Sequence, residues 1–369
     1  MRRPVSATST GALALAAALT VSGVTLTGAA AASAVPVTPS TGADSAVSLL
    51  STVDESAQQA ALDYWTPERM AAAEPAQQVV EQAQGSAQDS SGAGAGSAQT
   101  LQAPSPQTSQ PEASTLADGD APAVARGTRT TAGVVTGDAV STATTWTGEE
   151  VAAVGRLYFS QAGRNYECTA SSVDSPQGNV LVTAGHCLTE NGVASENVVF
   201  VPGLAGSTKP YGQWSVTKMF TTTQWKDGDQ TSAAALNHDV GFAQVAPSGG
   251  RSLQEAVGSF GIDFTDQLSR VTVFGYPGRS TNADGFTLQY CTGWQFTDAV
   301  TADSTTDRAV LCSMAGGSSG GPWVRDFDQQ TRSGTVTSVV SFSYNNAPEV
   351  LYGPLFGDTV EAVYEEALA

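Results

Sequence analysis

From about residue 150 to the C-terminus, short runs of β-branched and aromatic residues alternate with Gly, Asp, Asn and Pro. Runs of this kind, bounded by turn residues, are typical of β-strands. Many short strands predict an all-β sandwich or barrel, and about 220 residues are enough for two lobes. The pattern predicts strands at Val154–Phe159, Thr169–Val173, Val180–Thr183, Val198–Val201, Trp214–Phe220, Val240–Val245, Val271–Phe274, Phe286–Tyr290, Arg308–Cys312, Pro322–Val324 and Thr335–Phe342.

Within this region the pattern predicts one helix, at the C-terminal end. Asp358 can cap it, and Val360, Val363, Ala367 and Leu368 recur at helical spacing. A second helix start is predicted earlier in the chain, at Thr66-Pro67-Glu68, where an N-cap residue precedes a proline and an acid in the first turn.

The N-terminus has the pattern of a secretory signal. Met1-Arg2-Arg3 is followed by an apolar stretch from Gly11 to about Ala32 and by the small residues Ala32-Ser33-Ala34. We therefore expect a signal peptide at residues 1–34 and export to the extracellular space. A membrane anchor is the alternative, but Thr and Gly interrupt the stretch and no later segment is apolar enough to span a bilayer.

Residues 35–125 differ from the rest of the chain. Leu49, Leu50, Leu62, Tyr64, Trp65 and Met70 could pack, but from about Gln84 to Asp120 the composition falls to Ala, Ser, Gly, Gln and Pro. Such a composition predicts a disordered linker. The expected order is signal peptide 1–34, propeptide-like segment 35–125, connecting segment 126–149 and domain 150–369. The alternative to a propeptide is an exposed tail that stays attached.

Charge and histidine content narrow the function classes. The net charge is -19, which argues against a nucleic-acid-binding protein. Residues 35–125 hold eleven acids and one base, and residues 126–369 hold 24 acids and 13 bases. The chain has two histidines, so a mechanism with a histidine base must use His186 or His238.

The first candidate motif is Thr183-Ala184-Gly185-His186-Cys187, at the end of a predicted strand. The glycine allows a tight turn that presents His186, and a general base needs a fixed imidazole. Cys168 lies nineteen residues upstream and is the expected disulfide partner of Cys187. Closing such a loop stabilises the fold by about 3 kcal/mol.

The second motif, Ala315 to Pro322, places Ser319 among four glycines. A serine nucleophile needs a tight turn with free N–H groups. A flexible loop is one alternative, and the G-x-S-x-G elbow of α/β-hydrolases is another. The hydrolase alternative fails because no histidine follows Ser319. A subtilisin order would need Asp174, but no β–α alternation surrounds it.

The third motif is Asn237-His238-Asp239, at the start of an apolar strand. A buried carboxylate is costly unless it is paired, so Asp239 is the candidate to orient His186. Asp227 and Asp229 lie in a polar loop and are interpreted as solvated turn residues. His238 is interpreted as a flanking residue.

His186, Asp239 and Ser319, in that order and in these motifs, resemble the chymotrypsin-like (trypsin-fold) serine peptidases of the secreted bacterial trypsin-like or V8-like type. The resemblance covers about residues 150–369. It implies two packed antiparallel β-barrels with the active site between them, an oxyanion hole from the N–H groups of Gly317 and Ser319, and a Cys291–Cys312 disulfide. No cofactor is expected, and a zinc site is disfavoured because the chain has no C-x-x-C pair.

Three positions depart from better-known relatives. Ser318 stands where animal trypsins have the aspartate that pairs with the new N-terminus on activation. Ser313 stands where basic-specific trypsins have a pocket aspartate, and Val340 where glutamyl-specific V8-like enzymes have a histidine. With Ser341 and Ser343 as further expected pocket residues, we predict a neutral or apolar side chain at the cleavage site.

The sequence therefore predicts a secreted, monomeric serine endopeptidase that acts on proteins or peptides and binds its own propeptide. It predicts neither a nucleic-acid nor a membrane partner. Two alternatives remain open. One is a catalytically silent binding module on a protease fold, and the other is an esterase on the same scaffold.

Overall fold

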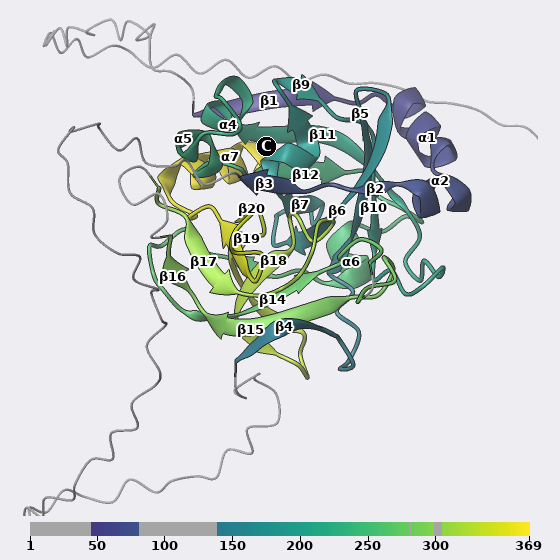
Figure 1. The fold of residues 1–369 in the computed structure, drawn as a ribbon. Coiled ribbons are helices and arrows are strands. Elements are labelled where there is room, and N and C mark those ends of the chain that lie inside the picture. Colours follow the sequence, from purple (N-terminus) through teal and green to yellow (C-terminus); the bar gives the residue numbers. More distant parts are fainter. Residues whose placement is uncertain (1–45, 81–138, 281, 299–304) are drawn as a thin grey trace, which may run out of the picture. The chain divides into compact units, whose positions relative to one another are not determined.

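The computed structural model describes residues 46–80, 139–280, 282–298 and 305–369 (Figure 1). The predicted signal peptide and the low-complexity stretch of residues 84–120 lie outside these residues. Within the described part of the chain, no helix is long and apolar enough to cross a membrane.

The first lobe is a closed barrel of six antiparallel strands. It closes because β11 pairs with both β10 and β12. Its first hairpin turns through Ala162 and Gly163, which both have positive φ, as a two-residue turn between twisted strands requires. The strands, in barrel order, are β5 Val154–Gln161, β6 Arg164–Val173, β7 Val180–Thr183, β12 Gly241–Val245, β11 Trp214–Thr222 and β10 Glu196–Pro202.

The second lobe consists of two sheets around a core that contains Val273, Trp323 and Leu351. One sheet has the order β13 Gly261–Ile262, β19 Ser333–Val339, β18 Pro322–Asp328, β14 Arg270–Gly275, β15 Gln289–Trp294 and β4 Val140–Thr145. The other has the order β16 Phe296–Thr297, β17 Arg308–Leu311, β21 Val350–Gly353, β20 Phe342–Tyr344 and β3 Gln78–Val80. The predicted all-β fold class with a C-terminal helix is confirmed. Of the two predicted antiparallel β-barrels, the first is a closed six-stranded barrel and the second lobe is formed by two sheets.

Residues 46–80 are integrated into both lobes. They form β1 Val47–Thr52, α1 Glu55–Tyr64, α2 Pro67–Ala72, β2 Glu74–Pro75 and β3. Strand β1 pairs with β11, and Trp65 and Met70 are buried, with the Trp65 ring against Tyr158. The predicted helix start is confirmed, because the Thr66 side chain accepts a hydrogen bond from the Arg69 N–H.

The helix predictions for the β domain need two corrections. Helix α7 spans Asp358–Leu368, but its N-cap is Gly357, so Asp358 is the first helical residue rather than the cap. The prediction of a single helix was wrong, since four one-turn helices fill connections between strands. They are α3 Gly185–Leu188, α4 Thr223–Asp227, α5 Ala233–Leu236 and α6 Leu253–Val257, and a small hairpin, β8 Thr189–Glu190 with β9 Val193–Ala194, follows α3.

Strands β6 and β18 extend beyond their predicted bounds, and two other predicted strands are shifted or broken. The strand placed at Phe286–Tyr290 begins only at Gln289, because the N–H groups of Phe286 and Thr287 bond to the Asp284 carboxylate in a turn. The strand placed at Thr335–Phe342 is broken after Val339. There the Val340 backbone bonds to Gly320 and Gly321 of the loop that carries Ser319.

The predicted connecting segment, residues 126–149, contains ordered structure in its described part. Strand β4 pairs with β15 at the edge of the second lobe. Trp146 follows it and packs edge-on against Phe274, Tyr290 and Phe327.

Candidate active site

His186 is the second residue of α3, directly after strand β7. A Cβ at the preceding Gly185 would lie 2.6 Å from Trp225 Cδ1 and 3.0 Å from Asp239 Oδ1, so the close approach requires glycine. Behind the histidine, Cys187 forms the predicted disulfide with Cys168 of β6. This bond ties α3 to the barrel wall and restricts the backbone that carries the imidazole.

Asp239 holds His186 at two points. The imidazole Nδ1 lies 2.8 Å from Asp239 Oδ2, and the His186 backbone N–H donates to Oδ1 at 2.8 Å. The aspartate is fully buried, and the Ser341 hydroxyl donates to Oδ2 at 2.5 Å. These contacts favour the tautomer with hydrogen on Nδ1, which leaves Nε2 free to accept a proton.

Ser319 lies on a loop between β17 and β18 whose backbone is bonded to the first lobe. The Thr169 N–H donates to the Ser319 carbonyl at 2.8 Å, and the Thr169 hydroxyl donates to the Gly317 carbonyl at 2.9 Å. Gly317 has φ +88°, a conformation that favours glycine. Sγ of Cys187 lies 3.9 Å from the Ser319 carbonyl oxygen, so the serine and histidine motifs meet in one site.

A buried arginine supports the same loop. Arg156 of β5 has no exposed surface and donates to the carbonyl of Gly317 at 3.3 Å, as well as to the carbonyls of Tyr276 and Gly285. Its guanidinium also pairs with Glu167 at 2.8 Å. By holding the Gly317 carbonyl, Arg156 helps to set the orientation of the loop that carries Ser319.

One carbonyl oxygen lies within reach of both the serine and a loop N–H. The Ala76 carbonyl accepts from the Gly317 N–H at 2.8 Å and from the Ser319 hydroxyl at 3.2 Å. Among the described residues, the buried Nε2 of His186 has no hydrogen-bond partner. The Ser319 hydroxyl is thus bonded to Ala76 rather than to the histidine.

A pocket beside Ser319 includes three of the four predicted specificity residues. Ser313 is the exception, because its hydroxyl accepts from the Ala143 N–H at 3.0 Å and its own N–H donates to the Ser141 carbonyl at 2.9 Å. Pairing with the β4 strand therefore keeps Ser313 out of the pocket wall. The lining residues are Gln77, Gln78, Met314, Ala315, Gly316, Ser318, Ser319, Val340, Ser341, Phe342, Ser343 and Leu351, and none of them is cationic.

No family model matches the chain. The glutamyl endopeptidase of Bacillus licheniformis is 28% identical over 163 residues, 42% of this chain and 46% of that protein. The extracellular metalloprotease of Bacillus subtilis is 28% identical over 175 residues, 46% of this chain and 50% of that protein. The chain therefore spans about half the length of the curated relatives it matches.

Two solved structures match over nearly their whole length. Protease Anisep from Arthrobacter nicotinovorans is 30% identical with a TM-score of 0.55, and the match covers 61% of this chain and 99% of that one. The thermostable serine protease AL20 from an extremophilic microorganism is 29% identical with a TM-score of 0.53, covering 59% and 97%. The chain belongs to the chymotrypsin-fold serine proteases.

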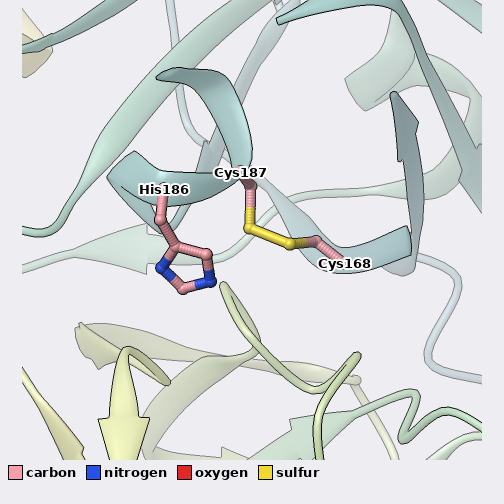
Figure 2. A group of neighbouring side chains, drawn as sticks. All are labelled: Cys168, His186 and Cys187. Atoms are coloured by element: carbon pink, nitrogen blue, oxygen red, sulfur yellow. A yellow bond between two sulfur atoms is a disulfide. The ribbon is translucent and has the colours of Figure 1, made fainter. Parts of the chain in front are cut away.

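The two cysteines beside His186, Cys168 and Cys187, are bonded to each other. Donor atoms of Cys168, His186 and Cys187 lie within 4.8 Å of one another, which is close enough to suggest a metal site. Figure 2 shows, however, that the two sulfurs form a disulfide next to the imidazole, so neither is a free thiolate. The predicted Cys291–Cys312 disulfide is also present, between β15 and the end of β17.

Other titratable groups near the protease site differ in environment. Burial lowers the pKa of His238, in keeping with a neutral flanking residue. Hydrogen bonds from Thr231 lower the pKa of the exposed Asp229, as expected for a solvated turn. Burial raises the pKa of Asp307 to about 7, and the carboxylates of Asp298 and Asp239 act in the same direction.

Sequence reasoning missed three contributors to this site. Ala76 has no chemically distinctive side chain, and only its backbone takes part. Arg156 and Thr169 lie in strands that were predicted, but their contacts to the nucleophile loop join residues about 150 positions apart. An arginine within an otherwise apolar strand was the one available signal, because a buried charge needs partners.

Proposed function

We propose that this chymotrypsin-fold chain is a secreted serine endopeptidase with Ser319 as nucleophile, His186 as general base and Asp239 as the residue that orients it. The position of the Ala76 carbonyl carries the proposal. In an acyl-transfer site the oxyanion donors bind the substrate's carbonyl oxygen, and the nucleophile lies beside the same carbonyl group. The Ala76 oxygen accepts from the Gly317 N–H at 2.8 Å and from the Ser319 hydroxyl at 3.2 Å, which supports this location for a substrate carbonyl.

In the proposed reaction, the Ser319 hydroxyl attacks the scissile carbonyl carbon while His186 Nε2 takes the hydroxyl proton. The N–H groups of Gly317 and Ser319 stabilise the oxyanion, each contributing about 3–4 kcal/mol to the transition state. His186 then gives the proton to the departing amine, and an acyl-enzyme remains. Water activated by the same histidine hydrolyses this ester and restores Ser319.

Asp239 prepares the histidine for both proton transfers. Its two oxygens bond the imidazole Nδ1 and the backbone of the same residue, so the ring and its carrier are fixed together. The ionised carboxylate also stabilises the imidazolium that forms during attack. This arrangement supports a role in orientation rather than as a proton acceptor.

For the substrate, we propose a neutral or apolar side chain at the cleavage site. The pocket wall contains Met314, Phe342 and Leu351, with Val340 in place of a histidine. One relative is named a glutamyl endopeptidase, so the opposing candidate is an acidic side chain. The pocket offers hydroxyls but no cation, and an unpaired buried carboxylate is costly. Peptides that differ only between Leu and Glu at this position measure the preference directly.

We also propose that the protein is exported and then processed. The signal-like residues 1–34 support secretion, and the relative that is named an extracellular metalloprotease agrees with it. We expect residues 35–125 to act as a propeptide ahead of the domain at 150–369, and the mature enzyme to be a monomer. N-terminal sequencing of the secreted protein tests these boundaries.

Labelling by a fluorophosphonate probe tests the catalytic assignment. We expect the secreted protein to be labelled at Ser319 and the Ser319→Ala variant to remain unlabelled. Labelling of the alanine variant at the wild-type rate would overturn the assignment. An esterase would hydrolyse esters but no peptides, and a silent binding module would neither react with the probe nor turn over either substrate.

A further inference from the structure

Residues 74–80, which we call the strap, run from β2 to β3 (Figure 1), and Ala76 between these strands contacts Gly317 and Ser319 of the candidate site. At one end, Glu74 and Pro75 pair with Tyr166 and Glu167 of β6 in the first lobe. At the other, Gln78–Val80 extend β20 in the second lobe. The Ala76 carbonyl between them accepts from the Gly317 N–H and the Ser319 hydroxyl, so the strap covers the place proposed for a substrate carbonyl.

The strap runs in the wrong direction for cleavage. In a peptide that is cut, the residue whose carbonyl is attacked places its own side chain in the specificity pocket. Here that residue is Ala76, and its side chain is buried in the core cluster of the first lobe that includes Cys168. The pocket is lined instead by Gln77 and Gln78, which lie on the leaving-group side of the Ala76 carbonyl.

The direction of the strap's backbone pairing agrees with this reversed orientation. Both ends of the strap pair parallel to their partner strands, with Val79 opposite Ser343 and Val80 opposite Tyr344. If Ser319 attacked Ala76, the amine of Gln77 would be the leaving group. That segment is held by the ladder with β20 and by a bond from the N–H of Asn345, the residue after β20, to the Val80 carbonyl. The Gln78 side-chain amide also donates to the Gln230 carbonyl in the first lobe at 2.9 Å. Because the Gln77 amine could not depart, it would attack the acyl group of Ala76 again and restore the Ala76–Gln77 peptide bond.

We propose that the strap is an inhibitor within the chain, bound backwards so that it blocks Ser319 and the pocket without being cleaved. This inference rests on the proposed function and adds how the site is regulated. The strap follows directly after the segment anchored by Trp65 and Met70, which are buried in the core. Because the link is short, the strap has a high effective concentration at the site. Activation then requires removal or displacement of residues 74–80.

Proline substitutions test the blockage in the full chain. The Val80 carbonyl is bonded to β20, so in a parallel ladder the N–H groups of Val80 and Gln78 face β20, whereas that of Val79 points away. We expect Gln78→Pro/Val80→Pro to raise the rate of fluorophosphonate labelling at Ser319 about tenfold or more, because it breaks the ladder. The matched control Val79→Pro should stay within about twofold of wild type, since no ladder bond is lost.

Equal labelling of the wild type and the double-proline variant would overturn the strap as an inhibitor. A folded double-proline variant that is never labelled at Ser319 would overturn the proposed function and the strap together. The two failures are therefore distinguishable in one experiment.

Engineered cysteine pairs test the direction independently of activity, in a Ser319→Ala background. Val79→Cys with Ser343→Cys should form a disulfide, because these residues are Cα partners. Ala73→Cys with Ser343→Cys probes the opposite polarity, since Ala73 lies as far before Ala76 as Val79 lies after it. We expect mass spectrometry of the non-reduced digest to detect the first bond only. Detection of the second bond instead would overturn the reversed binding.

Discussion

The histidine side of the site, His186 with Asp239, is held mainly within its own lobe, whereas the loop that carries Ser319 is held by both lobes. His186 is fixed by Asp239 and by the disulfide of its neighbour Cys187, all of which belong to the first barrel. The loop that carries Ser319 belongs to the second lobe, yet its carbonyls accept hydrogen bonds from Thr169 and Arg156 of the first.

We therefore expect substitutions in the two parts to lower activity for different reasons. A substitution that affects His186 or Asp239 should alter proton transfer and leave the Ser319 loop in place. A change in the bonds between lobes should displace the Gly317 N–H and weaken oxyanion stabilisation, although each lobe still folds. The histidine side also receives a hydrogen bond from the second lobe, because the Ser341 hydroxyl donates to Asp239.

The largest expected effect is that of Asp239→Asn. The amide cannot replace both carboxylate bonds to His186 and favours the wrong imidazole tautomer, so kcat should fall about 10⁴-fold with little change in KM. Steady-state kinetics on a peptide substrate measures this. Asp227→Asn is the matched control, since Asp227 is exposed and should leave kcat unchanged. A similar loss in both variants would contradict the assignment of Asp239.

Arg156→Met tests the support from the other lobe. It removes a donor to Gly317 and leaves Glu167 buried without its partner, so we expect about 3–5 kcal/mol lower stability and a kcat at least tenfold lower. Arg156→Met/Glu167→Gln should recover stability in denaturant unfolding, because the buried charge is removed, but should not recover kcat. Recovery of both would mean that Arg156 only stabilises the fold.

The carboxylate of Asp307 in the second lobe is repelled by that of Asp239, and its contribution to the free energy of unfolding should depend on pH. The pKa rises from 3.8 in the unfolded chain to about 7 in the folded one, so the folded state prefers the protonated form. Its contribution to stability is therefore present below about pH 4 and is lost as the pH rises towards 7. Asp307→Asn, which stays neutral, should match wild type near pH 4 and be more stable at pH 8 by roughly 1.4 kcal/mol for each unit of the shift. A difference in unfolding free energy between Asp307→Asn and wild type that stays constant from pH 4 to pH 8 would contradict the shift.

The smallest expected effect is that of Ser341→Ala. Asp239 keeps both bonds to His186 and loses only the hydroxyl of the second lobe, so kcat should fall about tenfold. Ser343→Ala serves as the control, because Ser343 lines the pocket and should change KM rather than kcat. An unchanged kcat in Ser341→Ala would show that the histidine side needs nothing from the second lobe.

The parts of the site that the sequence predicts are those with a local signal. The histidine, aspartate and serine motifs each combine a special residue type with a tight turn, and the cysteine spacing indicated the disulfide beside His186. Most strands were predicted because their apolar runs are continuous. The four short helices were missed, since a single turn carries no periodic pattern.

The remaining differences between sequence and structure come from contacts between distant residues. Ser313 occupies the expected position along the chain, but pairing with the β4 strand withdraws it from the pocket. Val340 interrupts a strand because its backbone is used by the nucleophile loop. Ala76 could not be selected from sequence, since any residue supplies a carbonyl and only the path of the chain brings this one to Ser319.

The buried Arg156 has a consequence for the proposed removal of the propeptide. In animal trypsins a freshly made N-terminus enters the protein and pairs with the aspartate before the nucleophile, so the site of the activating cut must be uniform. Here Ser318 takes that position, its hydroxyl bonds to the Ala315 carbonyl, and the loop is supported by a guanidinium that belongs to strand β5. Preparations with ragged N-termini, cut at different points between the strap and β4, should therefore share one specific activity.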